Sequence, residues 1–187
     1  MSSRFLSTRN LILVAMFVAL IAISGQIAIP FLVVPITLQT LVVMLAGSIL
    51  GRHLGALSTI VFILLVMAGA PILAGAQGGL GALLGPTGGY VWSWPIATYV
   101  IGVLVHREQP KLWRLILAHT VGGVCIVYLF GAIWLSVSLD LRWKETLLTG
   151  VLPFIPGDMV KVFVAAIVAR SVLKVYPSIG GRTVVSR

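Results

Sequence analysis

Asp158 and Lys161 have the residue types and spacing best suited to chemistry in this chain, because both carry charge inside an apolar stretch. A spacing of three residues places the two side chains on one helical face, where they can form an ion pair. An ionised carboxylate only accepts hydrogen bonds and an ammonium group only donates them, so the pair suits a ligand with N–H donors and an oxygen acceptor or carboxylate. A single carboxylate without His or Cys partners offers too few ligands for a metal ion. We therefore expect a small polar organic ligand, and no metal or cofactor.

The residues just before this pair predict a pocket around it. The segment from Pro153 to Gly157 should be irregular, and irregular backbone at membrane depth is tolerated only where it is buried in protein or lines a wet cavity. The stretch from Asp158 to Leu173 makes about 24 Å of helix, less than the bilayer core, so Asp158 should begin a helix below the outer boundary. Two structural roles remain open, a helix cap formed by Asp158 and a purely structural ion pair. Ionisable residues within spans usually mark substrate or proton paths, which favours function.

Other polar side chains on the outer side of the predicted spans are further candidates for ligand binding. Tyr90 can reach inward and offer a hydroxyl above an apolar ligand ring. Trp94 lies at a span boundary and is assigned to an interfacial aromatic belt instead. Thr37 is a further outer polar group. The predicted substrate-binding residues are Asp158, Lys161, Tyr90, Thr87, Gln39 and Gln77.

The composition assigns these residues to a membrane protein. Of 187 residues, 59% are hydrophobic and 9% are charged, and the mean hydropathy is +1.14, well outside the range of soluble domains. The net charge of +9 could suggest nucleic acid, but Lys and Arg stand singly between apolar stretches rather than on one face. That distribution indicates charges that set membrane topology.

Spanning the hydrocarbon core takes roughly 20 apolar residues, fewer where a helix meets a re-entrant segment. On this basis we predict an all-α integral membrane protein with six transmembrane helices in a single membrane domain, residues 1–187. The spans are placed at about 11–28, 38–50, 54–73, 90–105, 115–137 and 150–173.

Two links between the spans are unusual. Residues 30–37 are apolar but bracketed by Pro30 and Pro35, so they should fold over or into the protein rather than continue a helix. Residues 74–89 are rich in glycine and contain no charge, which is rare for an exposed loop.

The Lys and Arg positions orient the chain, because cytoplasmic loops carry an excess of these residues. With both termini in the cytoplasm, the outer loops hold only Arg142 and Lys144. The inner segments hold Arg4, Arg9, Arg52, Arg107, Lys111, Arg114, Arg170, Lys174, Arg182 and Arg187. This bias predicts a multi-pass protein of a prokaryotic plasma membrane, with the two unusual links and Asp158 on the outer side.

Catalytic motifs are absent from the sequence. Residues 81–89 lack the lysine of a G-x-x-x-x-G-K-[ST] phosphate loop, so this chain has no ATPase motif of its own. The G-x-S-x-G and H-E-x-x-H patterns are also missing. His119, alone on the fifth span, is interpreted as a packed or interfacial residue, although an intramembrane enzyme with His119 as base is a rival hypothesis. His53 and His106 are interpreted as solvated charges in inner loops. We expect a transport protein rather than an enzyme.

Ala15 and Ala19 in the first span form a small-xxx-small pattern that lets another helix approach closely. By itself this pattern is more typical of packing within the protein.

Three motifs taken together resemble the BioY family, the biotin-specific capture subunits of energy-coupling-factor (ECF) transporters. They are Val34-Pro35-Ile36-Thr37-Leu38-Gln39-Thr40, Leu84-Gly85-Pro86-Thr87-Gly88-Gly89-Tyr90 and Phe154-Ile155-Pro156-Gly157-Asp158-x-x-Lys161. They occur in the family's order, and the resemblance covers about residues 11–173.

The resemblance implies a six-helix fold that binds biotin near the outer face and has no cofactor. It also implies a partner module of one transmembrane coupling protein and two ATPase subunits. The family's binding Asp and Lys match Asp158 and Lys161, and its coupling-protein motif matches Ala15 and Ala19. Asp158 would accept from a ureido N–H, whereas Lys161 would meet either the ureido oxygen or the carboxylate. A solitary importer with Asp158 as proton relay is the rival in the same class.

Overall fold

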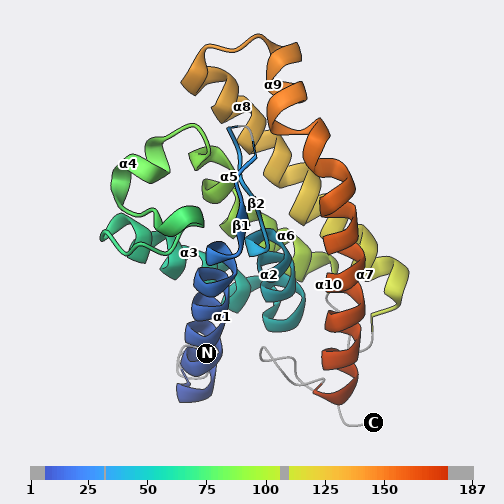
Figure 1. Ribbon diagram of the computed structural model, residues 1–187. Helices are drawn as coiled ribbons and strands as arrows, with labels where there is room; N and C mark the ends of the chain where they lie inside the picture. The colour runs from blue at the N-terminus through green and yellow to red at the C-terminus, as the bar shows by residue number, and fades with distance from the viewer. Residues whose placement is uncertain (1–6, 32, 106–109, 177–187) are drawn as a thin grey trace.

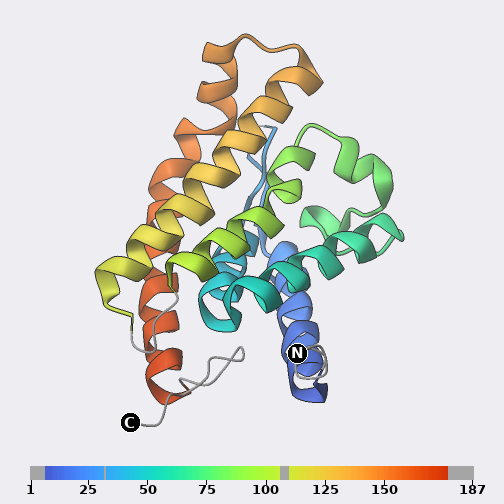
Figure 2. The ribbon, with the colours of Figure 1, turned by 180° about the vertical axis from the view of Figure 1, so that it is seen from behind.

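The computed structural model describes residues 7–31, 33–105 and 110–176, and in these ranges the backbone is nearly all helical (Figures 1 and 2). The main helices are α1 (Thr8–Gln26), α2 (Gln39–Leu45), α3 (Gly51–Met67), α6 (Trp94–Leu104), α7 (Leu112–His119), α8 (Val127–Leu139), α9 (Trp143–Gly150) and α10 (Ile155–Val175). Two π-helical segments extend them, η1 (Ala46–Leu50) after α2 and η3 (Thr120–Ile126) between α7 and α8. The predicted all-α character is confirmed.

Among the described residues, four helical stretches are long and apolar enough to cross a membrane. They are Thr8–Gln26, Gln39–Met67, Leu112–Leu139 and Trp143–Val175. The second stretch changes direction at Gly51, whose φ of +80° suits glycine. The six crossings therefore stay a prediction.

The start of α1 and the end of α10 lie at the same end of the molecule, opposite α9 (Trp143–Gly150), as Figures 1 and 2 show. This arrangement is compatible with two termini on one side of a membrane, and their cytoplasmic location stays a prediction.

Four of the cations used to orient the chain, and one histidine, lie outside the described residues. They are Arg4, Arg107, Arg182, Arg187 and His106.

Two helix boundaries differ most from the predicted ones. The third span was expected to reach Leu73, but α3 ends at Met67, and Gly69 follows with a φ of +99° that turns the chain. The last span was expected to begin at Gly150, but Gly150 ends α9. A short 3₁₀ segment, η4 (Leu152–Phe154), separates α9 from α10.

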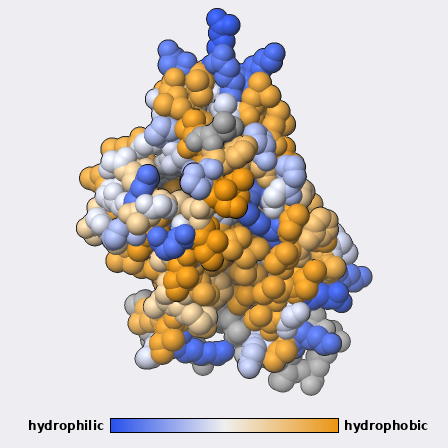
Figure 3. Space-filling view, viewed as in Figure 1, coloured by the Kyte–Doolittle hydropathy of each residue, from blue (hydrophilic) through white to orange (hydrophobic). Residues whose placement is uncertain are grey.

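The surface of the molecule is largely apolar. Figure 3 shows hydrophobic side chains over much of the visible face, with hydrophilic ones at the α8–α9 end, at the opposite end and in a few places across the middle. Val137, Val160 and Ile167 are exposed, which would be costly in water but suits contact with lipid tails.

The two unusual links have defined structure. Strands β1 (Ala28–Ile29) and β2 (Ile36–Thr37) of the first link form a small antiparallel hairpin, in which Ala28 pairs with Thr37. The glycine-rich link, residues 74–89, contains η2 (Ala74–Ala76) and α4 (Gly79–Leu84) and ends within α5 (Gly88–Trp92). Both links contribute residues to the wall of a cavity that α2, α6, α8 and α10 also line.

Candidate functional site

A cavity of about 510 Å³ lies between the hairpin, the glycine-rich link and helices α2, α6, α8 and α10. All six predicted substrate-binding residues lie on its wall: Asp158, Lys161, Tyr90, Thr87, Gln39 and Gln77. The predicted pocket is therefore present, and residues far apart in the sequence line it. Their roles in binding stay predictions.

The charged pair forms one side of this wall. Lys161 Nζ lies 2.7 Å from Asp158 Oδ1, so the predicted ion pair is confirmed. Asp158 is only 5% exposed, and its other oxygen, Oδ2, accepts a hydrogen bond from the hydroxyl of Tyr128 in α8. Lys161 also donates to Thr40 Oγ1 in α2 at 3.2 Å. The four side chains thus connect three helices, and burial makes each polar contact costly to lose.

The predicted helix cap at Asp158 is wrong. Helix α10 begins at Ile155, Phe154 is its N-cap residue, and no side chain caps it. Pro156 falls in the first turn, where a proline needs no N–H, so it begins the helix rather than breaking it. The irregular backbone lies earlier, at Val151 and in η4. The Asp158 carboxylate is thus in the first helical turn with its oxygens bonded to side chains.

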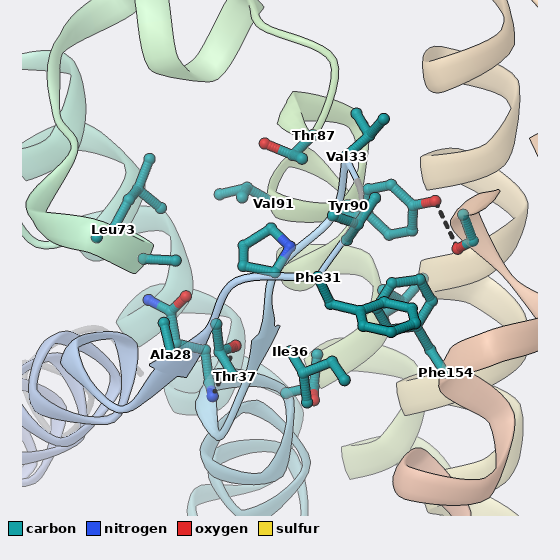
Figure 4. Close-up of a pocket in the computed structure, with 18 of the residues that line it drawn as sticks. Ala28, Phe31, Val33, Ile36, Thr37, Leu73, Thr87, Tyr90, Val91 and Phe154 are labelled. Carbon is teal, nitrogen blue, oxygen red and sulfur yellow. Dashed lines mark hydrogen bonds between the residues drawn. The ribbon is translucent and has the colours of Figure 1, made fainter.

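Tyr90 contributes its ring rather than a free hydroxyl donor. It is 8% exposed, and its hydroxyl donates to the carbonyl oxygen of Gly150 at 2.8 Å (Figure 4). A Cβ on Gly131 would lie 2.2 Å from Tyr90 Cδ1, so α8 approaches the ring closely because it carries glycine there. Tyr90 therefore ties the glycine-rich link to α8 and to the end of α9.

The predicted amide and hydroxyl groups divide into buried and accessible ones. Gln39 is 3% exposed, and its side-chain nitrogen lies 3.4 Å from the carbonyl oxygen of Ile21. Thr37 Oγ1 accepts from the backbone N–H of Gln39 at 3.3 Å. Gln77 and Thr87 are less buried and also line a second cavity of about 410 Å³. They lie where the main cavity meets this second one.

Aromatic rings form much of the apolar wall. Phe31 of the hairpin and Phe154 of η4 meet edge to face, with ring centroids 5.7 Å apart (Figure 4). Trp94 also lines the cavity and is 3% exposed, packed 5.5 Å from the ring of Phe62. The assignment of Trp94 to an interfacial belt is therefore wrong, because a belt residue would face the headgroup region.

Tyr128 and Thr40 are site residues that the sequence reasoning missed. Both lie on the cavity wall and bond to the charged pair. The phenol of Tyr128 near the middle of the fifth span was the available signal, because a phenol buried in a membrane needs a partner.

The remaining candidates lie elsewhere. His119 is fully buried but is not part of the cavity wall, which removes the basis for an enzyme with His119 as base. Ala15 and Ala19 are exposed on α1, away from the cavity. Within residues 7–31, 33–105 and 110–176, no three His, Cys, Asp or Glu side chains lie close enough to hold a metal ion.

Comparisons with known proteins agree on one family. The model of the BioY family matches residues 1–178. A protein of Rhizobium etli named biotin transporter BioY is 37% identical over 95% of this chain and 100% of its own. One of the same name from Rhodobacter capsulatus is 41% identical over 91% of this chain and 96% of its own.

Two solved structures are similar as well. The first is described as the S-component for biotin from an ECF-type ABC transporter, with a TM-score of 0.83 and 34% identity. It covers 93% of this chain and 95% of its own. The second, FolT with folic acid, has a TM-score of 0.59 at 16% identity over 86% of this chain and 95% of its own, and supports the fold alone.

Proposed function

Because this chain belongs to the BioY family, we propose that it is the biotin-binding subunit of a vitamin importer. It is a multi-pass membrane protein and a transport protein rather than an enzyme, as its relatives and its solved neighbour are. In this proposal it captures biotin from the outer side of a prokaryotic plasma membrane. An ECF coupling module driven by ATP then delivers the unchanged vitamin inward.

The observation that carries the proposal is the buried Asp158–Lys161 pair on the wall of an otherwise apolar cavity. Biotin has a cyclic urea with two N–H donors and one oxygen acceptor, an apolar ring with sulfur, and a carboxylate. Asp158 is suited to accept from a ureido N–H, and Lys161 to donate to an oxygen of the ligand. The cavity's volume is within the usual range for small-molecule sites.

The apolar rings and the outer polar groups complete the proposed site. Phe31, Phe154 and Trp94 offer apolar surface for the ring and chain of the vitamin. The ring of Tyr90 adds to this surface, while its hydroxyl holds the wall in place. Gln77 and Thr87 line both cavities, which supports their proposed role as further polar contacts of the ligand.

Direct binding of biotin to the purified protein tests the site. Asp158→Asn keeps the shape and removes the charge, and Lys161→Ala removes the donor, so each should weaken binding by about 100-fold or more. Asp140→Asn and Lys174→Ala make matched changes at exposed positions and should bind as the wild type does. Unchanged binding in both site variants would refute the site assignment.

A partner module is proposed for transport, made of a transmembrane coupling protein and two ATPase subunits. Ala15 and Ala19 are exposed on α1 among apolar side chains, which suits close approach of a partner helix. Affinity-tagged protein should copurify with ATPase subunits, and Ala19→Phe should prevent this. Val137→Phe adds the same bulk at an exposed position on α8 and should leave copurification intact.

Uptake by vesicles containing this chain alone separates the proposal from the solitary importer. In that rival, Asp158 carries a proton, and uptake stops when the proton gradient is collapsed. The ECF proposal instead requires ATP and the coupling subunits for uptake.

A further inference from the structure

Tyr128 holds the Asp158 carboxylate in one orientation. Its hydroxyl donates to Oδ2, while the ammonium group of Lys161 donates to Oδ1 at 2.7 Å. With one donor on each oxygen, the carboxylate cannot turn about its last side-chain bond without breaking both contacts. The two donors come from different helices, α8 and α10, so the orientation depends on tertiary structure.

The bonds already made determine what this cluster still offers to a ligand. Each carboxylate oxygen accepts about two hydrogen bonds, so each oxygen of Asp158 keeps one free acceptor position. The proton of the Tyr128 hydroxyl is used on Asp158, so the phenol oxygen offers only acceptor positions. Lys161 uses two of its three protons, on Asp158 and on Thr40. The cluster is thus rich in acceptors and has one donor left.

We propose that Tyr128 is a substrate-positioning residue, which fixes Asp158 and adds its own oxygen as an acceptor for a ligand that presents two adjacent N–H donors beside one oxygen. This inference rests on the proposed function for the identity of the ligand, since a cyclic urea has that pattern. A ligand carboxylate would instead meet Asp158 with like charge and only one donor.

Biotin binding to Tyr128→Phe tests this role, because Phe keeps the ring and removes only the hydroxyl. The loss of a hydrogen bond to a charged group predicts about 10- to 100-fold weaker binding. Tyr99→Phe makes the same change on an exposed part of α6, outside the cavity, and should bind as the wild type does. A loss of less than about twofold in Tyr128→Phe would overturn the proposal.

A double-variant comparison distinguishes positioning from general packing. If Tyr128 acts partly through Asp158, then Tyr128→Phe should cost clearly less biotin affinity when Asp158→Asn is already present than it does in the wild type. Equal losses in both backgrounds would show that Tyr128 acts independently of Asp158. If the wild type itself does not bind biotin, the proposed function fails, and this result differs from the failure of Tyr128 alone.

A biotin analogue with both ureido nitrogens methylated supplies a second measurement. The wild type should reject it strongly, since the acceptors would be left unpaired. That rejection should shrink in Tyr128→Phe. If Tyr128→Phe does not fold, Asp158→Asn can be used instead, because it removes the charge of the carboxylate that Tyr128 holds. It should also show a smaller preference for biotin over the methylated analogue. Unchanged discrimination in the folded variant would overturn the proposal.

Discussion

The cavity and the packed region around α3 and α6 are built in opposite ways. At the cavity, side chains from three helices meet through the polar contacts of Asp158, Lys161 and Tyr128. Between α3 and α6 the backbones themselves come close, and a Cβ on Gly102 would lie 2.2 Å from the backbone nitrogen of Arg52. Close packing stabilises a membrane protein, whereas buried charges serve mainly the ligand. The comparison teaches that one region holds the fold and the other gives up stability for binding.

Removing one partner of the charged pair should change stability more than any other variant that compares the two regions. Lys161→Met leaves the buried Asp158 carboxylate without its ion-pair partner, so stability should fall by about 3–5 kcal/mol. Adding Asp158→Leu removes the uncompensated charge and should restore most of that stability while biotin binding stays lost. Thermal unfolding and biotin binding of detergent-solubilised protein measure both effects.

Lys174→Met is the control for this pair of variants, because it removes an exposed ammonium group from the same helix. Its stability should stay within about 0.5 kcal/mol of the wild type. A double variant as unstable as Lys161→Met alone would contradict the comparison, since the pair would then hold the fold.

A methyl group in the packed region should have the next largest effect. Gly102→Ala places a Cβ against the backbone of Arg52, so the two segments must move apart, which should cost about 1–3 kcal/mol. Gly81→Ala in α4 meets no atom within 4 Å and should be neutral or slightly stabilising, since Ala favours helix. Thermal unfolding compares the two. Equal melting temperatures would show that the close approach is dispensable.

Tyr90 tests whether a residue of the cavity wall contributes mainly to stability or mainly to biotin affinity. Tyr90→Phe removes the donor to the Gly150 carbonyl and should cost about 0.5–1.5 kcal/mol of stability. Biotin affinity should change less than in Tyr128→Phe, because the Tyr90 hydroxyl is bonded to the backbone. Calorimetric titration of both variants checks this order, and a larger loss of affinity in Tyr90→Phe would reverse the roles assigned to the two tyrosines.

The sequence predicted the helices better than their ends. Long apolar runs imply helices because backbone N–H and C=O groups in hydrocarbon can form hydrogen bonds only within the protein. The pocket beside Asp158 was predicted because a charged residue at membrane depth needs a polar environment. The start of α10 was placed wrongly because Pro156 is tolerated in a first helical turn. Tyr128 was missed because it lies 30 positions from Asp158, and no local spacing relates them. Contacts between helices of this kind depend on packing that a single sequence does not display.

The smallest expected effect comes from the hairpin over the cavity. Phe31 is 39% exposed and meets Phe154 edge to face, so Phe31→Ala removes little packing from the fold and part of the apolar wall. Biotin affinity should fall by about 3- to 10-fold, the equivalent of about 0.5–1.5 kcal/mol for one aromatic contact. The melting temperature without biotin should be nearly unchanged. Val33→Ala, at another exposed position of the same hairpin, should weaken binding less because it removes fewer apolar atoms. A large drop in the melting temperature of Phe31→Ala without biotin would contradict this. It would show that the hairpin stabilises the fold, as the packed region does, rather than mainly contacting the ligand.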